Sequence, residues 1–282
     1  MTPSDEHPEV SGVAGASQDS TLRLEHGDVH VRQDGPRDAP ALLLVHGSAT
    51  SSRSWDALVP PLTMSHHVIR VDLPGHGRSA APVDGRGYET PEQARTLGTA
   101  LDRLGVERVV AVGHSSGGYA ATALAEQRSD LVAALALIST GPSMNAFIAP
   151  ETAVLDPARW PPTDEGIRQF ASTGFREGYD VPRELVEELR GMTNQAVTAA
   201  ARAASAYLSQ RALPVRLTAV GKPLQVIFGD QDRRWRPSSA ADYRAVPGAR
   251  VDVLTGAGHT PILEEPLRTA ALLLAFVALH TT

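Results

Sequence analysis

Cysteine is absent from this chain of 282 residues, which excludes disulfide bonds, thiolate catalysis and cysteine-ligated metals. A long apolar run is missing too. The longest, AALLLAFVALH near the C-terminus, is too short to cross a bilayer and indicates a packed helix. The first twenty residues lack a basic stretch followed by an apolar one, so they predict a flexible tail rather than a signal peptide. A cytoplasmic location is expected by default.

The chain also has no excess of positive charge. Its formal net charge is −6, with acidic and basic residues interspersed along the sequence. Nucleic acid and anionic membranes are therefore not expected as partners. An apolar content of 42% and a charged content of 21% are ordinary for a soluble globular protein. We expect a small-molecule substrate, and the sequence leaves open whether the protein forms a homodimer.

Short apolar runs that end in turns alternate with helical segments over most of the chain. The runs are ALLLV, HVIRV, VVAVG, VAALALI and LQVIF, and they are typical of strands buried on both faces. Strands that alternate with helices in this way form a mostly parallel sheet. The sequence therefore predicts an α/β fold with a mostly parallel central sheet and helices on both of its faces.

The alternation stops between residues 143 and 220. The first part of this segment is irregular and rich in proline and aromatic residues, and the second part is helical. Its apolar stripe of Leu185, Leu189, Met192 and Ala196 has helical spacing and is expected to pack against the sheet domain. We predict a tail at residues 1–20, a core formed by residues 21–142 and 221–282, and an inserted helical cap, or lid, at residues 143–220.

Two adjacent serines follow the apolar run VVAVG, in the stretch GHSSGG. A G-x-S-x-G pattern between a strand and a helix is the context of a nucleophile elbow, a sharp turn that presents a serine hydroxyl. The residues two before and two after the nucleophile must be small. Gly113 and Gly117 satisfy this for Ser115, whereas His114 is too large for Ser116 to satisfy it. Ser115 is therefore the candidate nucleophile, and Ser116 is expected to offer its backbone N–H to an oxyanion.

A serine needs a base, and the base needs an acid that orients it. His259 lies in a glycine-rich loop after the last expected strand, where a general base could sit. Two acids, Asp230 and Asp232, follow the preceding strand. Asp232 is the stronger candidate because it lies further into the loop and can lean towards His259, whereas Asp230 is expected to cap the turn.

An oxyanion site needs N–H donors from a second loop. The His46-Gly47 turn follows the first long buried strand and would bring the N–H of Ser48 towards the elbow, with Ala49 as the less favoured alternative. Together with the N–H of Ser116, this donor would complete an oxyanion hole. Removing one such donor typically costs about 3–4 kcal/mol of transition-state stabilisation.

Four landmarks occur in a set order along the chain: the His46-Gly47 turn, DLPGHGRS at residues 72–79, the elbow, and GAGHTPILEEP around His259. From about Thr21 to the end, outside the cap, the chain resembles the α/β-hydrolase superfamily in its serine-nucleophile branch with a helical cap. Esterases, carbon–carbon bond hydrolases and cofactorless perhydrolases belong to that branch. The resemblance implies no cofactor.

The resemblance implies a Ser-His-Asp mechanism. Ser115 would attack a carbonyl, His259 would take its proton and return it to the leaving group, and Asp232 would hold His259 in the right tautomer. It also implies structural roles for four residues near the site: His46, His76, Arg78 and His114. Dehalogenases and epoxide hydrolases of the superfamily carry aspartate in the elbow, so both activities are disfavoured.

Other patterns carry less functional information. His66 and His67 are adjacent and lack the spacing of a metal site, so no metal is expected. The basic cluster of Arg233, Arg234 and Arg236 predicts a solvated loop, with recognition of a substrate carboxylate or phosphate as the minority interpretation. Five aromatic residues of the cap could line an acyl pocket or serve in ordinary packing: Trp160, Phe170, Phe175, Tyr179 and Tyr207.

The favoured function is therefore hydrolysis of a carboxylic ester, thioester or lactone of a small-to-medium apolar substrate. One alternative keeps the same triad for carbon–carbon bond hydrolysis, perhydrolysis, or acyl transfer or cyclisation in a biosynthetic pathway. A second alternative is a non-catalytic ligand receptor, because the fold alone does not establish turnover. The sequence does not identify the substrate.

Overall fold

The structure is a computed structural model, and it describes residues 17–150 and 155–280. Residues 1–16 of the expected tail lie outside the described residues. The end of that expected tail is wrong, because strand β1 (Gln18–Leu24) already begins there and pairs with β2 (Gly27–Asp34) along its whole length. Main-chain pairing with β2 outweighs the polar composition of the first residues of β1.

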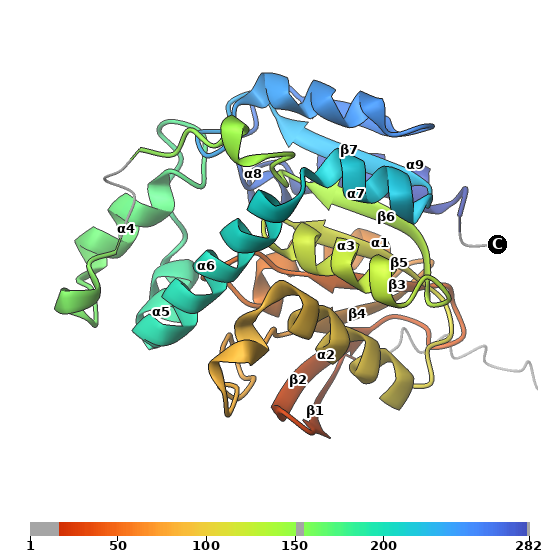
Figure 1. Ribbon diagram of the computed structural model, residues 1–282, viewed down its shortest axis with the longest axis horizontal. Coiled ribbons are helices and arrows are strands. Elements are labelled where there is room, and N and C mark those ends of the chain that lie inside the picture. Colours follow the sequence, from red (N-terminus) through yellow and green to blue (C-terminus); the bar gives the residue numbers. More distant parts are fainter. Residues whose placement is uncertain (1–16, 151–154, 281–282) are drawn as a thin grey trace, which may run out of the picture.

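The described residues form one sheet of eight strands in the order β1-β2-β4-β3-β5-β6-β7-β8. The pairs β1/β2 and β2/β4 are antiparallel, and every pair from β4/β3 to β7/β8 is parallel. This confirms the predicted α/β fold with a mostly parallel sheet (Figure 1). The remaining strands are β3 (Ala41–Val45), β4 (His67–Val71), β5 (Val109–His114), β6 (Val132–Ile138), β7 (Leu224–Gly229) and β8 (Arg250–Leu254).

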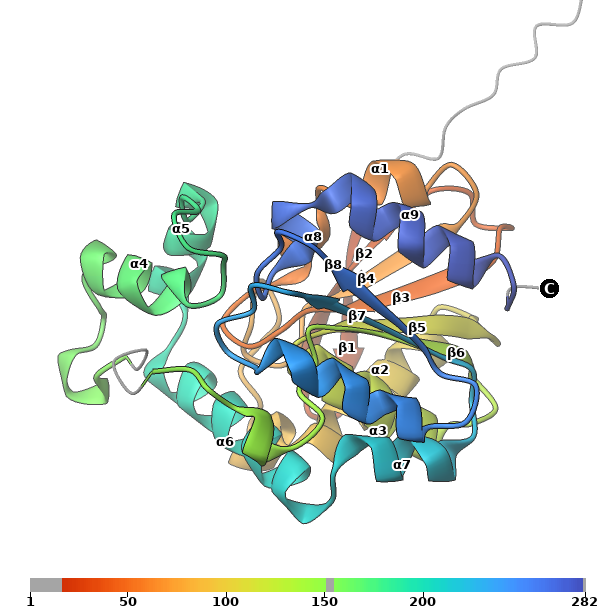
Figure 2. The ribbon, with the colours of Figure 1, turned by 90° about the horizontal axis from the view of Figure 1, so that it is seen from above.

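Helices cover both faces of the sheet. In Figure 2, α1 and α9 lie on one face, whereas α2, α3 and α7 lie on the other. The α-helices are α1 (Val59–Leu62), α2 (Thr90–Arg103), α3 (Gly117–Gln127), α4 (Asp164–Ser172), α5 (Arg183–Gly191), α6 (Asn194–Gln210), α7 (Leu213–Val220), α8 (Pro261–Glu264) and α9 (Pro266–Val277). Short 3-10 helices are η1 (Ser52–Trp55), η2 (Gly85–Tyr88), η3 (Met144–Ala146), η4 (Pro157–Arg159) and η5 (Pro237–Ala245).

The central strands are apolar on both faces because each face meets a layer of helices. In β3, Leu43 and Val45 join the apolar cluster beneath α2 and α3, and Leu42 and Leu44 join the cluster beneath α1 and α9. All four side chains are fully buried. Burying one such side chain stabilises the fold by roughly 1.5–3 kcal/mol. This two-sided burial explains the continuous apolar runs of the sequence.

The segment between β6 and β7 covers the edge of the sheet at which the parallel strands end. Helices α4 and α5 stand away from the sheet in both views, and α6 leads back to it (Figures 1 and 2). The expected cap boundary at residue 220 differs from the structure, because Leu213 and Leu217 of α7 pack in the core cluster beside α3. The segment between residues 181 and 212 forms two helices, which are separated at Met192 and Thr193.

None of the helices between residues 17 and 280, outside the gap at 151–154, has the length and apolarity that a membrane crossing requires.

Candidate active site

Ser115 occupies the sharp turn between β5 and α3. Its φ of 53° lies in the left-handed region, which is strained for a residue other than glycine. The surrounding backbone holds it there. The Ser115 N–H donates to the carbonyl of Ile138 at 2.8 Å, and its own carbonyl accepts from Gly118 N and Thr140 Oγ1, both at 3.0 Å. The turn therefore presents the Ser115 hydroxyl at the end of the sheet.

The glycines on either side of Ser115 lie against backbone atoms. A Cβ on Gly113 would lie 2.4 Å from the Cα of Gly118, and one on Gly117 would lie 2.3 Å from the carbonyl oxygen of Val45. Neither neighbour is the end of a flexible side chain that could move away. These distances give the physical reason for the size rule that selects Ser115 from the pair of serines.

A chain of two hydrogen bonds joins Ser115 to the residues expected to be its base and acid. Ser115 Oγ lies 3.0 Å from His259 Nε2, and His259 Nδ1 lies 2.9 Å from Asp232 Oδ2. Because an ionised carboxylate only accepts, His259 donates through Nδ1–H and accepts from the serine through Nε2. Both His259 and Asp232 are buried, whereas Ser115 is partly exposed. The three residues meet although 144 positions separate Ser115 from His259.

The two candidate acids take different places in the loop after β7. Asp232 accepts from His259 through one oxygen, and its other oxygen accepts from the N–H groups of Arg234 and Trp235 at 2.8 and 3.0 Å. Asp230 is exposed, and its carboxylate accepts from the N–H of Gly256 at 2.7 Å. Asp230 therefore caps a turn, as expected, and Asp232 alone of the two reaches His259.

The loop after β3 lies directly against the elbow. A Cβ on Gly47 would come within 3.1 Å of the Cβ of Ser115, a tighter contact than most Cβ atoms make, so the two segments approach closely here. The hydroxyls of Ser48 and Ser116 are 2.8 Å apart and join the two loops. Within residues 17–150 and 155–280, the N–H groups of Ser48 and Ser116 donate to no protein acceptor. Both donors are thus available near the Ser115 hydroxyl.

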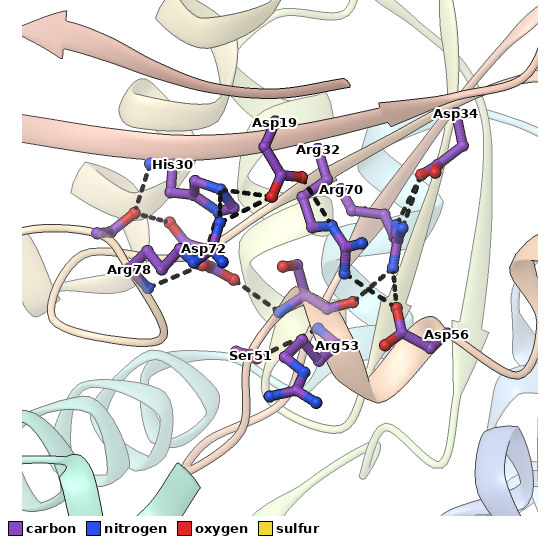
Figure 3. A network of polar contacts seen from close by, with 12 residues as sticks. Asp19, His30, Arg32, Asp34, Ser51, Arg53, Asp56, Arg70, Asp72 and Arg78 are labelled. Carbon is purple, nitrogen blue, oxygen red and sulfur yellow. Dashed lines mark hydrogen bonds and ion pairs between the residues drawn. The ribbon is translucent and has the colours of Figure 1, made fainter. Parts of the chain in front are cut away.

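Asp72, the first residue of DLPGHGRS, holds the loop that contains Ser48 (Figure 3). Its carboxylate accepts from Ser52 N at 2.7 Å, from Arg78 N at 2.9 Å and from His30 Nδ1 at 3.0 Å. Burial alone would raise the pKa of Asp72, but the nearby His46 and the hydrogen bonds from Arg78 and Ser52 hold it below its usual value. The guanidinium of Arg78 is turned outward to Asp19, 2.7 Å away, in agreement with its expected structural role.

Three buried histidines near the site make structural contacts. His46 donates through Nδ1 to the carbonyl of Gly47 and accepts the N–H of Leu73 through Nε2, so it joins the two loops as a neutral ring. Nε2 of His114 donates to the carbonyl of His259 at 2.9 Å. Burial lowers the pKa of His114 to about 3 and that of His76 to about 4. None of these three side chains bonds to Ser115.

Two pockets open at Ser115. The larger has a volume of about 220 Å³ and the smaller about 40 Å³. Ser48, Ser115, Phe170 and Arg234 line both, whereas His259 lines the smaller one. A third cleft has a volume of about 640 Å³. It is lined by the polar residues around Asp72 and by Glu187, Glu188 and Gly191 of α5, and no triad residue contributes to its lining. The two pockets at Ser115 are therefore the ones that suit a reacting substrate.

Of the five aromatic residues that could line an acyl pocket, two line the pockets at Ser115 and three do not. Phe170 lines both pockets, and Phe175 lines the smaller one. The other three are not among the lining residues, because their polar ends bond elsewhere. The hydroxyl of Tyr207 donates to Glu126, that of Tyr179 to the carbonyl of Leu263, and the indole of Trp160 to the carbonyl of Met192.

Sequence reasoning missed several residues that line the pockets. Trp235 and Tyr119 line the larger pocket, and each lies within four positions of a triad residue. That closeness is the signal by which they could have been found. Leu185 and Leu189, which we expect to pack against the sheet domain, belong to an apolar cluster that joins cap residues to Ala49 and Leu263 of the core, and they also line the smaller pocket.

Comparisons with known proteins agree with this architecture. The alpha/beta hydrolase family matches residues 42–272. A Bacillus subtilis protein, provisionally named as a 2-succinyl-6-hydroxy-2,4-cyclohexadiene-1-carboxylate synthase, is 28% identical over 252 residues, which cover 84% of this chain and 89% of the relative. A bifunctional esterase/perhydrolase of Acinetobacter calcoaceticus is 37% identical over 119 residues, 42% of either chain.

Among solved structures, a hydrolase from Pseudomonas aeruginosa superimposes with a TM-score of 0.77 at 25% identity. The superposition covers 95% of this chain and 99% of the other. The family match spans most of the chain and includes the elbow, the Asp232 loop and His259. The chain therefore belongs to the alpha/beta hydrolase family and is an enzyme of the hydrolase type.

Proposed function

We propose that the protein is a serine hydrolase that cleaves a carboxylic ester, thioester or lactone through an acyl-enzyme on Ser115. One observation carries the proposal: Ser115 is hydrogen-bonded through His259 to Asp232, and the N–H groups of Ser48 and Ser116, in the two loops that meet at Ser115, have no acceptor among the described residues. A base, an orienting acid and oxyanion donors are the parts that acyl transfer to serine requires.

The first half of the reaction forms the acyl-enzyme. His259 Nε2 takes the Ser115 hydroxyl proton as Oγ bonds to the substrate carbonyl carbon. The N–H groups of Ser48 and Ser116 donate to the oxyanion that develops, and Asp232 stabilises the imidazolium. The bond to the leaving group then breaks, and His259 gives its proton to the departing oxygen or sulfur.

The second half releases the acid. His259 takes a proton from a water molecule, whose oxygen bonds to the acyl carbon, and the tetrahedral species uses the same two N–H donors. The bond to Ser115 Oγ then breaks and the serine recovers its proton from His259. Pockets of about 220 and 40 Å³ suit a small-to-medium acyl group and a compact leaving group.

Turnover of p-nitrophenyl butyrate by three proteins tests the proposal. The wild type should be active, and Ser115→Ala should lose at least about 10³-fold in kcat because the nucleophile is gone. Ser116→Ala is the matched control, since it keeps the backbone N–H and removes the hydroxyl that bonds to Ser48 but leaves the Ser115 nucleophile in place. Wild-type activity in Ser115→Ala would refute the assignment. Product analysis separates hydrolysis from transfer to another acceptor.

A further inference from the structure

The guanidinium of Arg234 lies where the two pockets meet. Arg234 and Ser115 are both among the lining residues of each pocket. His259 must reach the leaving-group atom in order to protonate it. The smaller pocket, which His259 lines, therefore takes the leaving group, and the larger pocket takes the acyl part of the substrate.

The charge of Arg234 has no acidic partner among the described residues. Its Nε donates to Thr173 Oγ1 at 3.2 Å and one Nη to the carbonyl of Phe170 at 3.4 Å, and its carbon lies 5.2 Å from the centre of the Phe170 ring. In the described part of the chain no carboxylate oxygen comes within 4.0 Å of the guanidinium. The other Nη has no protein acceptor there.

This arrangement differs from that of two other enclosed arginines. Arg70 lies 2.7 Å from Asp34, and Arg216 lies 3.0 Å from Glu126. A cation enclosed without a partner is costly, because burial removes part of its hydration. Burial lowers the pKa of Arg234, whereas Asp232 acts in the opposite direction. The oxygens of Asp232 are already occupied by His259 and two backbone N–H groups.

The larger pocket supplies apolar contacts around this one cation. Its lining includes Tyr119, Phe147, Phe170, Leu208 and Trp235. A planar guanidinium edge matches the two oxygens of a carboxylate. A single positive charge in an apolar pocket suits a monoanion on an apolar chain better than a more highly charged group.

We propose that Arg234 binds a carboxylate at the distal end of the substrate's acyl chain, so that the preferred substrates are half-esters or half-thioesters of dicarboxylic acids. The inference rests on the proposed function, since it names the substrate class of the same site. The carboxylate takes no part in bond making. Ser115 attacks the ester carbonyl as before, and the products are a dicarboxylate and the leaving alcohol or thiol.

Matched substrates separate charge recognition from a merely structural role. The p-nitrophenyl half-esters of glutarate, adipate and pimelate are compared with p-nitrophenyl pentanoate, hexanoate and heptanoate, which replace the carboxylate by a methyl group. The wild type should show the higher kcat/KM for at least one half-ester. Arg234→Gln should lower that value about 10- to 100-fold, mainly through KM, and leave the neutral esters within about threefold.

Two variants serve as controls. Arg233→Gln removes an exposed neighbouring arginine and should keep the preference. Arg234→Lys keeps the positive charge but lacks the planar guanidinium, so it should retain part of the preference for half-esters. If Arg234 only holds its loop against the end of α4, Arg234→Gln should lower kcat/KM equally for the half-esters and the neutral esters. That result would overturn the proposal.

A binding readout does not depend on turnover. Adipate should raise the melting temperature of the wild type more than hexanoate does, and Arg234→Gln should abolish that difference. An equal effect of the two acids on the wild type overturns the inference. Ser115-dependent turnover of neutral esters without a preference for half-esters refutes this inference alone. Turnover that is independent of Ser115 refutes the proposed function.

Discussion

The carboxylate of Asp232 divides its two oxygens between His259 and its own loop. Oδ2 lies 2.9 Å from His259 Nδ1, and Oδ1 accepts two backbone N–H groups at 2.8 and 3.0 Å. The loop therefore fixes the carboxylate before it meets the imidazole. This arrangement sets the tautomer of His259 and leaves Nε2 free to accept the Ser115 proton.

Replacing Asp232 by asparagine should lower kcat about 10³- to 10⁴-fold with little loss of stability. An amide nitrogen in place of Oδ2 would donate to Nδ1 and favour the tautomer that cannot accept the Ser115 proton. Asp230→Asn is the control, because an asparagine oxygen can still accept from Gly256. Steady-state kinetics and melting curves on both variants check this. Equal activities in the two variants would contradict the assigned roles.

Gly113→Ala should destabilise the protein by about 2–3 kcal/mol, because the new methyl group would overlap the backbone of Gly118. Gly191→Ala is a contrasting substitution. A Cβ at Gly191 meets no atom within 4 Å, and alanine favours a helix over glycine. That variant should be unchanged or more stable by up to about 1 kcal/mol. Urea unfolding measures the free energy of unfolding of both variants. Similar losses of stability in the two would contradict the close contact between Gly113 and Gly118.

Asp72→Ala should destabilise the protein by roughly 3 kcal/mol and lower its activity. The N–H groups of Ser52 and Arg78 would lose their acceptor, and the loop that carries Ser48 would lose its anchor. Asp84→Ala removes an exposed acid that pairs with Arg86 and should change the stability by less than about 0.5 kcal/mol. Urea titrations with parallel ester assays measure both effects. Full activity in Asp72→Ala would contradict the anchoring role.

Acidification from pH 7.5 to 5.0 should lower the free energy of unfolding. Burial holds the pKa of His76 at about 4 and that of His114 at about 3, below the ordinary value of 6.5. Between these values the unfolded chain binds more protons, so stability is full above about pH 6.5 and is lost as the pH falls towards 4 and 3. His76→Asn should show a shallower pH dependence in urea titrations. Stability that rises on acidification would show that these histidines are not buried as neutral rings.

The sequence predicted the site better than the cap for a physical reason. The elbow depends on Gly113 and Gly117, which are close neighbours of Ser115, and the loops of Asp232 and His259 follow strands whose ends a parallel sheet brings together. These constraints are local or follow from the topology. The first residues of β1, which we assigned to the tail, are polar, and only their main-chain pairing with the neighbouring β2, Gln18 opposite Gln33, shows that the strand begins there.

The cap residues depend on contacts between segments that are far apart in the sequence. Tyr207 turns to Glu126 on α3, and Phe170 meets Arg234 from the loop after β7. Neither partner could be inferred from composition or helical spacing. For the same reason the sequence could not single out Arg234 from its arginine neighbours, since its lack of an acidic partner is a property of the folded chain.

The most direct test of the central claim is covalent labelling of the nucleophile. A p-nitrophenyl alkylphosphonate should release one p-nitrophenol per chain, and fragment mass spectra should place the phosphonyl group on Ser115. Ser116→Ala should label at a rate close to that of the wild type, whereas Ser115→Ala should not label. A phosphonyl group on Ser116, or unchanged labelling of Ser115→Ala, would contradict the account.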